Sequence, residues 1–251
     1  MLWRVEYRNH LPYFSIAIGL TVAAGIATAA ATHVEVFAVV LAMTGLVAWV
    51  ATTVYVAAAI LRFLTLGHDT LLHLSVLSPW RLTARKALVL GSYMVAQHVA
   101  TLMAQTPHIS DTVGAERTTV FAYLFAAKVV SIAAFLIAVV LVATIAKTMR
   151  GRGPATTVFV VSLVVVVTAQ AIVLWRLGAP GTKSFFIGVG GDFTTVNLYA
   201  NVLPLILTGP ADGFLPPIAG LSVVLNAGAA ACMLLGTLAL VRWRRFDHVA
   251  L

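Results

Sequence analysis

Charged residues are scarce in this chain. Only 10% of its 251 residues are Asp, Glu, Lys or Arg, whereas soluble domains average about 25%. Hydrophobic residues make up 61%. This composition excludes an ordinary soluble domain. It predicts an integral membrane protein with a single transmembrane domain over residues 1–251 and no large soluble domain beside it.

Cysteine and the usual catalytic motifs are also missing. Cys232 stands alone, so the chain cannot form an internal disulfide or a multi-cysteine metal site. The glycines of segment 188–191 are not followed by Gly-Lys-Ser/Thr and therefore do not form a phosphate-binding loop. Of the seven histidines, only His98 is expected in mid-membrane, which argues against a haem with two histidine ligands. We expect no catalytic residue, metal or cofactor in this chain, which by itself is not an enzyme.

Acidic residues are few, and none is expected inside the apolar stretches. All eight Asp and Glu residues map to loops or to the ends of these stretches. Ion-driven transporters usually place a carboxylate within the bundle. The pattern therefore argues against ion-driven transport and favours an energy source outside this chain.

Six apolar stretches are long enough, at about 20 residues, to cross a bilayer as helices. They are 13–31, 36–63, 87–105, 119–146, 155–175 and 217–241. Twelve of the 16 Lys and Arg residues fall on the side of the N-terminus, three fall on the other side, and Lys128 lies within a stretch. The positive-inside rule then predicts an all-α bundle of six transmembrane helices with both termini in the cytoplasm. The cytoplasmic location of these basic residues also accounts for the net charge of +8, so this charge does not indicate nucleic-acid binding.

Three segments between or before these stretches differ in composition. Segment 1–12 alternates charged and aromatic residues, which predicts a helix on the inner leaflet with Trp3 and Tyr7 among the lipid headgroups. Segment 64–86 is a basic interruption on the cytoplasmic side. Segment 177–216 is rich in Gly and Pro but contains apolar pieces, which favours short re-entrant helices at the outer leaflet. A plain tail and a plain loop are the alternatives for the first and last segments.

Polar residues within the apolar stretches are candidates for a pathway. Lys128 is expected either to extend outward or to pair with Asp111 or Glu116, and it could have a structural role or contact a substrate. Other intramembrane polar residues could line a pathway or form hydrogen bonds between helices. These residues are Gln97, His98, Gln170 and Asn226.

The cytoplasmic segment carries a more specific pattern. Asp69 precedes a leucine-rich stretch, then come Val76–Leu77–Ser78 and Trp80–Arg81, and a basic residue opens the third apolar stretch. In this pattern, and in its layout of six spans, the chain resembles the permease subunits of type-2 ABC exporters. The family's usual proline is missing at Val76, and Pro79 follows the serine instead. The residues that the resemblance assigns to coupling with an ATPase are Asp69, Leu71, Leu72, Leu74, Leu77, Ser78, Trp80 and Arg81.

The resemblance also implies partner subunits and a function. Segment 64–86 would contain a coupling helix that docks on a separate ATPase subunit, present in two copies, which binds ATP and Mg²⁺. A second copy of this chain, or a sister permease, would complete the pathway in a bacterial inner (plasma) membrane. The expected function is export of an amphiphilic substrate, such as an antimicrobial peptide, a drug or a lipid-like molecule. The alternatives are a non-transporting membrane scaffold or assembly factor and, less favoured, a secondary transporter.

Overall fold

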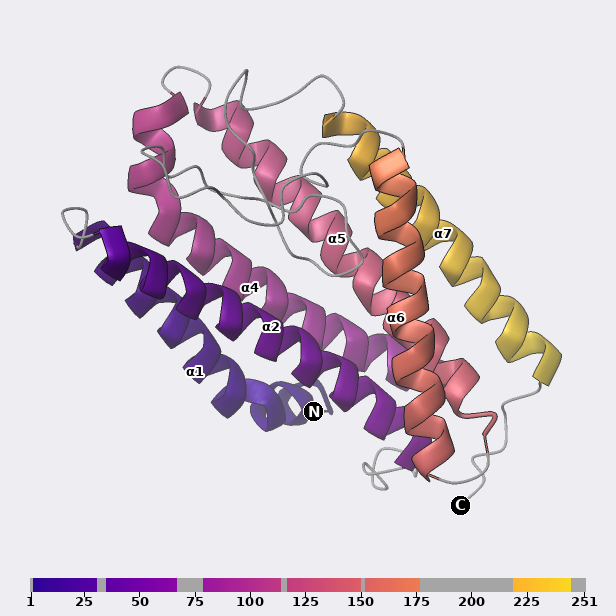
Figure 1. Cartoon of the computed structure of the whole chain (residues 1–251). Coiled ribbons are helices and arrows are strands. Elements are labelled where there is room, and N and C mark those ends of the chain that lie inside the picture. Colours follow the sequence, from indigo (N-terminus) through magenta and orange to yellow (C-terminus); the bar gives the residue numbers. More distant parts are fainter. Residues whose placement is uncertain are drawn as a thin grey trace.

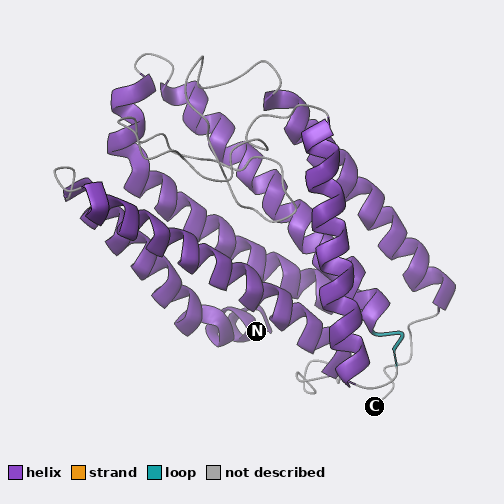
Figure 2. Cartoon of the chain, in the orientation of Figure 1, coloured by secondary structure: helices purple, strands orange, loops and turns teal. Residues whose placement is uncertain are grey.

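Six long helices run alternately up and down in the computed structural model (Figure 1). The model describes residues 2–30, 35–66, 79–113, 117–149, 152–176 and 219–244. Apart from a turn at 147–149, all of these residues are helical and none forms a strand (Figure 2). The expected all-α fold is therefore confirmed over this part of the chain. The helices are α1 (Leu2–Ala30), α2 (Glu35–Leu66), α4 (Pro79–Val113), α5 (Arg117–Ala146), α6 (Arg152–Arg176) and α7 (Ala219–Arg244).

Three of these helices are long and apolar enough to cross a membrane, as judged by length and composition. Their apolar segments are Trp3–Ala27, Val47–Thr65 and Phe125–Ala146. Shorter apolar segments occur in α6 and α7, at Gly153–Val166 and Asn226–Arg242. The expectation of a membrane protein is confirmed at this level. The number of six spans and their orientation stay predictions.

Helix α5 occupies the centre of the bundle. It packs against α4 and α2 on one side and against α6 and α7 on the other, while α1 covers α2 and α4 (Figure 1). Its residues Phe135, Val139 and Val142 recur at helical spacing and are buried in the main hydrophobic cluster. On α4, a Cβ added at Gly91 would lie 2.8 Å from Leu136 Cδ1. Glycine at this position therefore allows α4 and α5 to approach closely.

Helix α1 is continuous through Pro12, so the predicted surface helix 1–12 and the first apolar stretch form one helix. The contacts of its first turns nevertheless show a change of direction. Glu6 lies beside Lys86 of α4, whereas the next residue, Tyr7, reaches Ser92. These two α4 positions are about 9 Å apart along the helix axis. The first turns of α1 therefore lie across α4, and the helix bends before it runs up the bundle (Figure 1).

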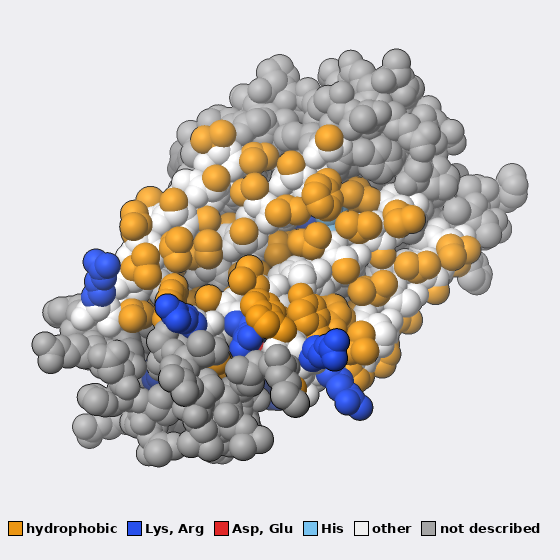
Figure 3. All heavy atoms as spheres, turned by 180° about the vertical axis from the view of Figure 1, so that it is seen from behind, with side chains coloured by type: hydrophobic (Ala, Val, Ile, Leu, Met, Phe, Trp, Pro, Cys, Tyr) orange, Lys and Arg blue, Asp and Glu red, His pale blue; other side chains and the backbone are white. Residues whose placement is uncertain are grey.

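Basic side chains gather at one end of the molecule. Figure 3 shows most of the visible Lys and Arg side chains along the lower edge, below a broad hydrophobic surface. This is the end where α1 begins, α2 ends and α4 begins (Figure 1). Arg81 and Arg85 lie in the first two turns of α4, so the predicted segment 64–86 ends in helix. Residues 67–78 and the predicted re-entrant segment lie outside the described residues.

Candidate functional site

Most of the residues expected to couple the chain to an ATPase lie outside the described residues. Two of them belong to the first turn of α4, where Trp80 packs against the hydrophobic cluster and Arg81 is exposed. The end of α2 and the start of α4, which flank the undescribed coupling residues, are described, and they lie beside the start of α1 (Figure 1). The residues that are not described are Asp69, Leu71, Leu72, Leu74, Leu77 and Ser78.

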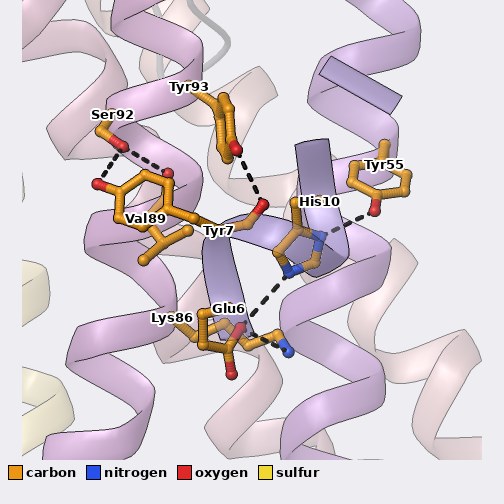
Figure 4. Close-up of polar contacts among 8 residues, drawn as sticks. All are labelled: Glu6, Tyr7, His10, Tyr55, Lys86, Val89, Ser92 and Tyr93. Carbon is orange, nitrogen blue, oxygen red and sulfur yellow. Dashed lines mark hydrogen bonds and ion pairs between the residues drawn. The ribbon is translucent and has the colours of Figure 1, made fainter. Parts of the chain in front are cut away.

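A buried ionic cluster joins the start of α1 to α4 (Figure 4). Glu6 is 2% exposed, and its Oε2 lies 3.6 Å from Lys86 Nζ and 3.6 Å from His10 Nε2. The Lys86 ammonium also lies 4.9 Å from the centre of the Phe63 ring on α2. Both Glu6 distances are beyond ordinary hydrogen-bond length, so the attraction is mainly Coulombic. Because an unpaired buried charge is costly, this cluster fixes how α1 sits on α4.

Hydrogen bonds from tyrosines hold the same segment on both sides. On α2, the Tyr55 hydroxyl lies 2.8 Å from His10 Nδ1. On α4, the Tyr93 hydroxyl donates to the backbone carbonyl of Tyr7 at 2.8 Å, and the Tyr7 hydroxyl lies 2.9 Å from Ser92 Oγ (Figure 4). The first turns of α1 are thus tied to α2 and α4 at once.

Aromatic rings continue this attachment into the bundle. Phe14, which is fully buried, stacks on Tyr93 with ring centres 4.4 Å apart and meets Tyr55 edge-on at 5.9 Å. Tyr13 stacks on Tyr55 at 3.8 Å. Near the start of both helices, the half-buried Arg85 guanidinium of α4 lies 4.6 Å from the centre of the Trp3 ring of α1. Such ring contacts contribute beyond the area they bury and favour one packing arrangement of the three helices.

Lys128 lies in the middle of the bundle and not at its surface. Lys128 is 4% exposed, and its Nζ lies 4.3 Å from the centre of the Trp49 ring on α2. The structure therefore differs from the expectation that this side chain extends outward. Its surroundings are those of an ammonium held against an aromatic face.

The other polar residues expected in the bundle are buried where their side chains are described. Gln97 is 0% exposed and donates from Nε2 to Thr21 Oγ1 of α1 at 3.4 Å, which confirms a contact between helices. The ring of His98 lies 6.4 Å from that of Phe125 on α5. Asn226 is 2% exposed on α7. Gln170 belongs to α6, but its side chain is not among those described.

The Glu6 cluster was not singled out from the sequence, although the sequence contains a signal for it. No other Asp or Glu occurs before Glu35. On a helix, Glu6 and His10 share one face with Phe14 and Ala17, and all four residues are buried. An acid and a histidine on a face that continues with apolar residues indicate a buried ion pair, because a buried carboxylate needs a partner.

Comparison of this chain with protein-family models, with curated proteins and with solved structures gave no match. Its own residues must therefore indicate what it can do. At the basic end they connect α1 to α2 and α4, and in the middle of the bundle they hold a buried lysine against an aromatic ring. Among the described residues, no group of three His, Cys, Asp or Glu could hold a metal ion.

Proposed function

We propose that this chain is the membrane-spanning permease subunit of an ATP-driven ABC exporter whose ATP is hydrolysed by a separate subunit. The observation that best supports this proposal is the attachment of α1 to α4 through Glu6 and Lys86. Lys86 lies two turns after α4 begins at Pro79, and it is the last residue of segment 64–86, which is expected to contain the helix that docks on the ATPase. A push on that segment would therefore move α1 together with α4 instead of bending one helix alone.

The proposed topology has six spans with both termini in the cytoplasm. The alternating run of the described helices and the basic residues gathered at one end of the bundle support this orientation (Figures 1 and 3). With an even number of spans, the N-terminus, the segment between α2 and α4, and the C-terminus share the cytoplasmic side.

The proposed substrate is amphiphilic, and the pathway forms between two permeases. Helices α6 and α7 expose apolar side chains, including Val164 and Leu235, which fit contact with lipid or a second permease. Six spans cannot easily enclose both halves of a pathway, so the complex would contain two permeases and two ATPases. Export is the favoured direction.

Replacing Leu74 by Asp is expected to release the ATPase. In this proposal, Leu74 docks in an apolar groove of the ATPase, and losing such an anchor costs about 2 kcal/mol or more. The tagged chain is purified from its native membrane in mild detergent, and the amount of P-loop ATPase that accompanies it is measured. We expect a stoichiometric ATPase with the wild-type chain and at least about a tenfold loss with Leu74→Asp.

The matched control is Leu11→Asp, which places the same charge on an exposed leucine of α1 near the same end of the bundle. This variant is expected to retain the ATPase. Undiminished ATPase with Leu74→Asp would contradict docking through the segment between α2 and α4. A wild-type sample without any ATPase would favour a membrane scaffold or assembly factor instead.

A further inference from the structure

Lys128 lies well inside α5 and far from Asp111, one of the two carboxylates expected to pair with it, whereas the other, Glu116, lies outside the described residues. Helix α5 begins at Arg117, eleven residues earlier, which is about 16 Å along the axis. On the neighbouring helix α4, His98 lies level with Phe125, and Asp111 follows His98 by thirteen residues, about 20 Å further along. These distances exceed the reach of the Lys128 side chain. The backbone positions therefore argue against the expected pair between Lys128 and Asp111.

The described surroundings of Lys128 provide little negative charge. The face of the Trp49 ring attracts the ammonium, but it carries only the partial charge of a quadrupole. Glu6 is the one carboxylate whose side chain the structure describes, and it pairs with Lys86 and His10 at the basic end of the bundle. A cation inside a membrane protein is costly and usually has a function.

Other polar groups reach the same depth of the bundle. Phe125 precedes Lys128 by three residues on one face of α5, and its ring faces His98 of α4. The adjacent Gln97 is fully buried and donates to Thr21 of α1. In Figure 3, small areas of blue and pale blue are visible in a hollow midway along the hydrophobic surface. Lys128 of α5 and His98 of α4 thus lie at a similar depth in a largely apolar bundle.

We propose that Lys128 binds the anionic headgroup of an amphiphile, with Trp49 beside it and His98 of α4 at the same depth of the bundle. An ammonium offers three N–H donors, and a phosphate or carboxylate would supply a counter-charge through strong charge-assisted hydrogen bonds. The apolar side chains of the bundle would contact the acyl chain. That this amphiphile is the exported substrate rests on the proposed function, whereas its binding requires only this chain.

The test measures binding of dodecyl phosphate to the purified chain in a neutral detergent by isothermal titration calorimetry. The comparison compounds are dodecyltrimethylammonium, which reverses the headgroup charge, and inorganic phosphate, which lacks the acyl chain. We expect dodecyl phosphate to bind more tightly than either. Lys128→Met should weaken its binding at least about tenfold, and Lys128→Arg should keep it within about threefold.

The matched control is Lys147→Met, which removes the next lysine along the chain, just after α5, and should leave binding unchanged. Equal binding of the cationic and anionic amphiphiles to the wild-type chain would overturn the site, and this comparison needs no variant. Unchanged binding by folded Lys128→Met would also overturn it. If the chain binds dodecyl phosphate selectively but recruits no ATPase, the Lys128 site stands and the proposed exporter function is contradicted. If the chain recruits an ATPase but does not bind dodecyl phosphate selectively, the exporter function stands and the Lys128 site is contradicted.

Discussion

Replacing Lys86 by Met is expected to destabilise the chain by about 3–5 kcal/mol, because it leaves the buried Glu6 carboxylate without its ammonium partner. Both residues are almost fully buried, so water cannot compensate for the loss. His10 is the nearest alternative partner, at 3.6 Å. The free energy of unfolding is measured for the chain in detergent micelles, with SDS as denaturant and helicity followed by circular dichroism.

Two further variants separate the ion pair from other effects at the same position. Glu6→Gln combined with Lys86→Met removes both charges, and it should recover most of the lost stability, since neutral replacement of a buried ion pair is often nearly neutral. Arg4→Gln changes an exposed charge on the other face of α1 and should shift the unfolding free energy by less than about 0.5 kcal/mol. A Lys86→Met chain as stable as the wild type would show that the pair does not hold α1 on α4.

Replacing Phe14 by Ala is expected to cost about 3 kcal/mol in unfolding free energy. The side chain is fully buried and fills the space between Tyr93 of α4 and Tyr55 of α2. Because rigid helices surround it, the neighbouring rings cannot collapse completely into the cavity. The same SDS unfolding experiment measures this loss.

Leu11→Ala is the control for this variant, because Leu11 lies on the same helix but is 52% exposed. Its substitution should change the unfolding free energy by less than about 0.5 kcal/mol. Similar losses for Phe14→Ala and Leu11→Ala would indicate that the stacked rings contribute no more than general helix packing. That result would remove Phe14 from the attachment between α1, α2 and α4.

The helices could be predicted from the sequence because the transmembrane helices of a membrane protein are long apolar runs. The run 119–146 corresponds to α5, Arg117–Ala146, and the run 155–175 corresponds to α6, Arg152–Arg176. In the membrane every backbone polar group must be satisfied within the segment, so a run of this length has few alternatives to a helix. The predicted boundaries were less accurate where the helices extend beyond the apolar run, as α4 does at both ends.

Contacts between distant residues could not be predicted in the same way. Glu6 and Lys86 are separated by 80 residues, and hydropathy contains no information on which faces of α1 and α4 meet. The alternation of charged and aromatic residues predicted a separate surface helix over 1–12, but α1 continues through Pro12, since neighbouring groups can satisfy a backbone that proline disturbs. The depth of Lys128 followed from its position in the run, whereas its contact with Trp49 did not.

The composition of the purified complex tests the proposed function most directly. The tagged chain is isolated from its native membrane in mild detergent and its assemblies are weighed by native mass spectrometry. We predict an assembly with two permeases, either two copies of this 26.5 kDa chain or one copy and a sister permease, bound to two copies of a P-loop ATPase. Assemblies that contain this chain but never an ATPase would contradict the exporter.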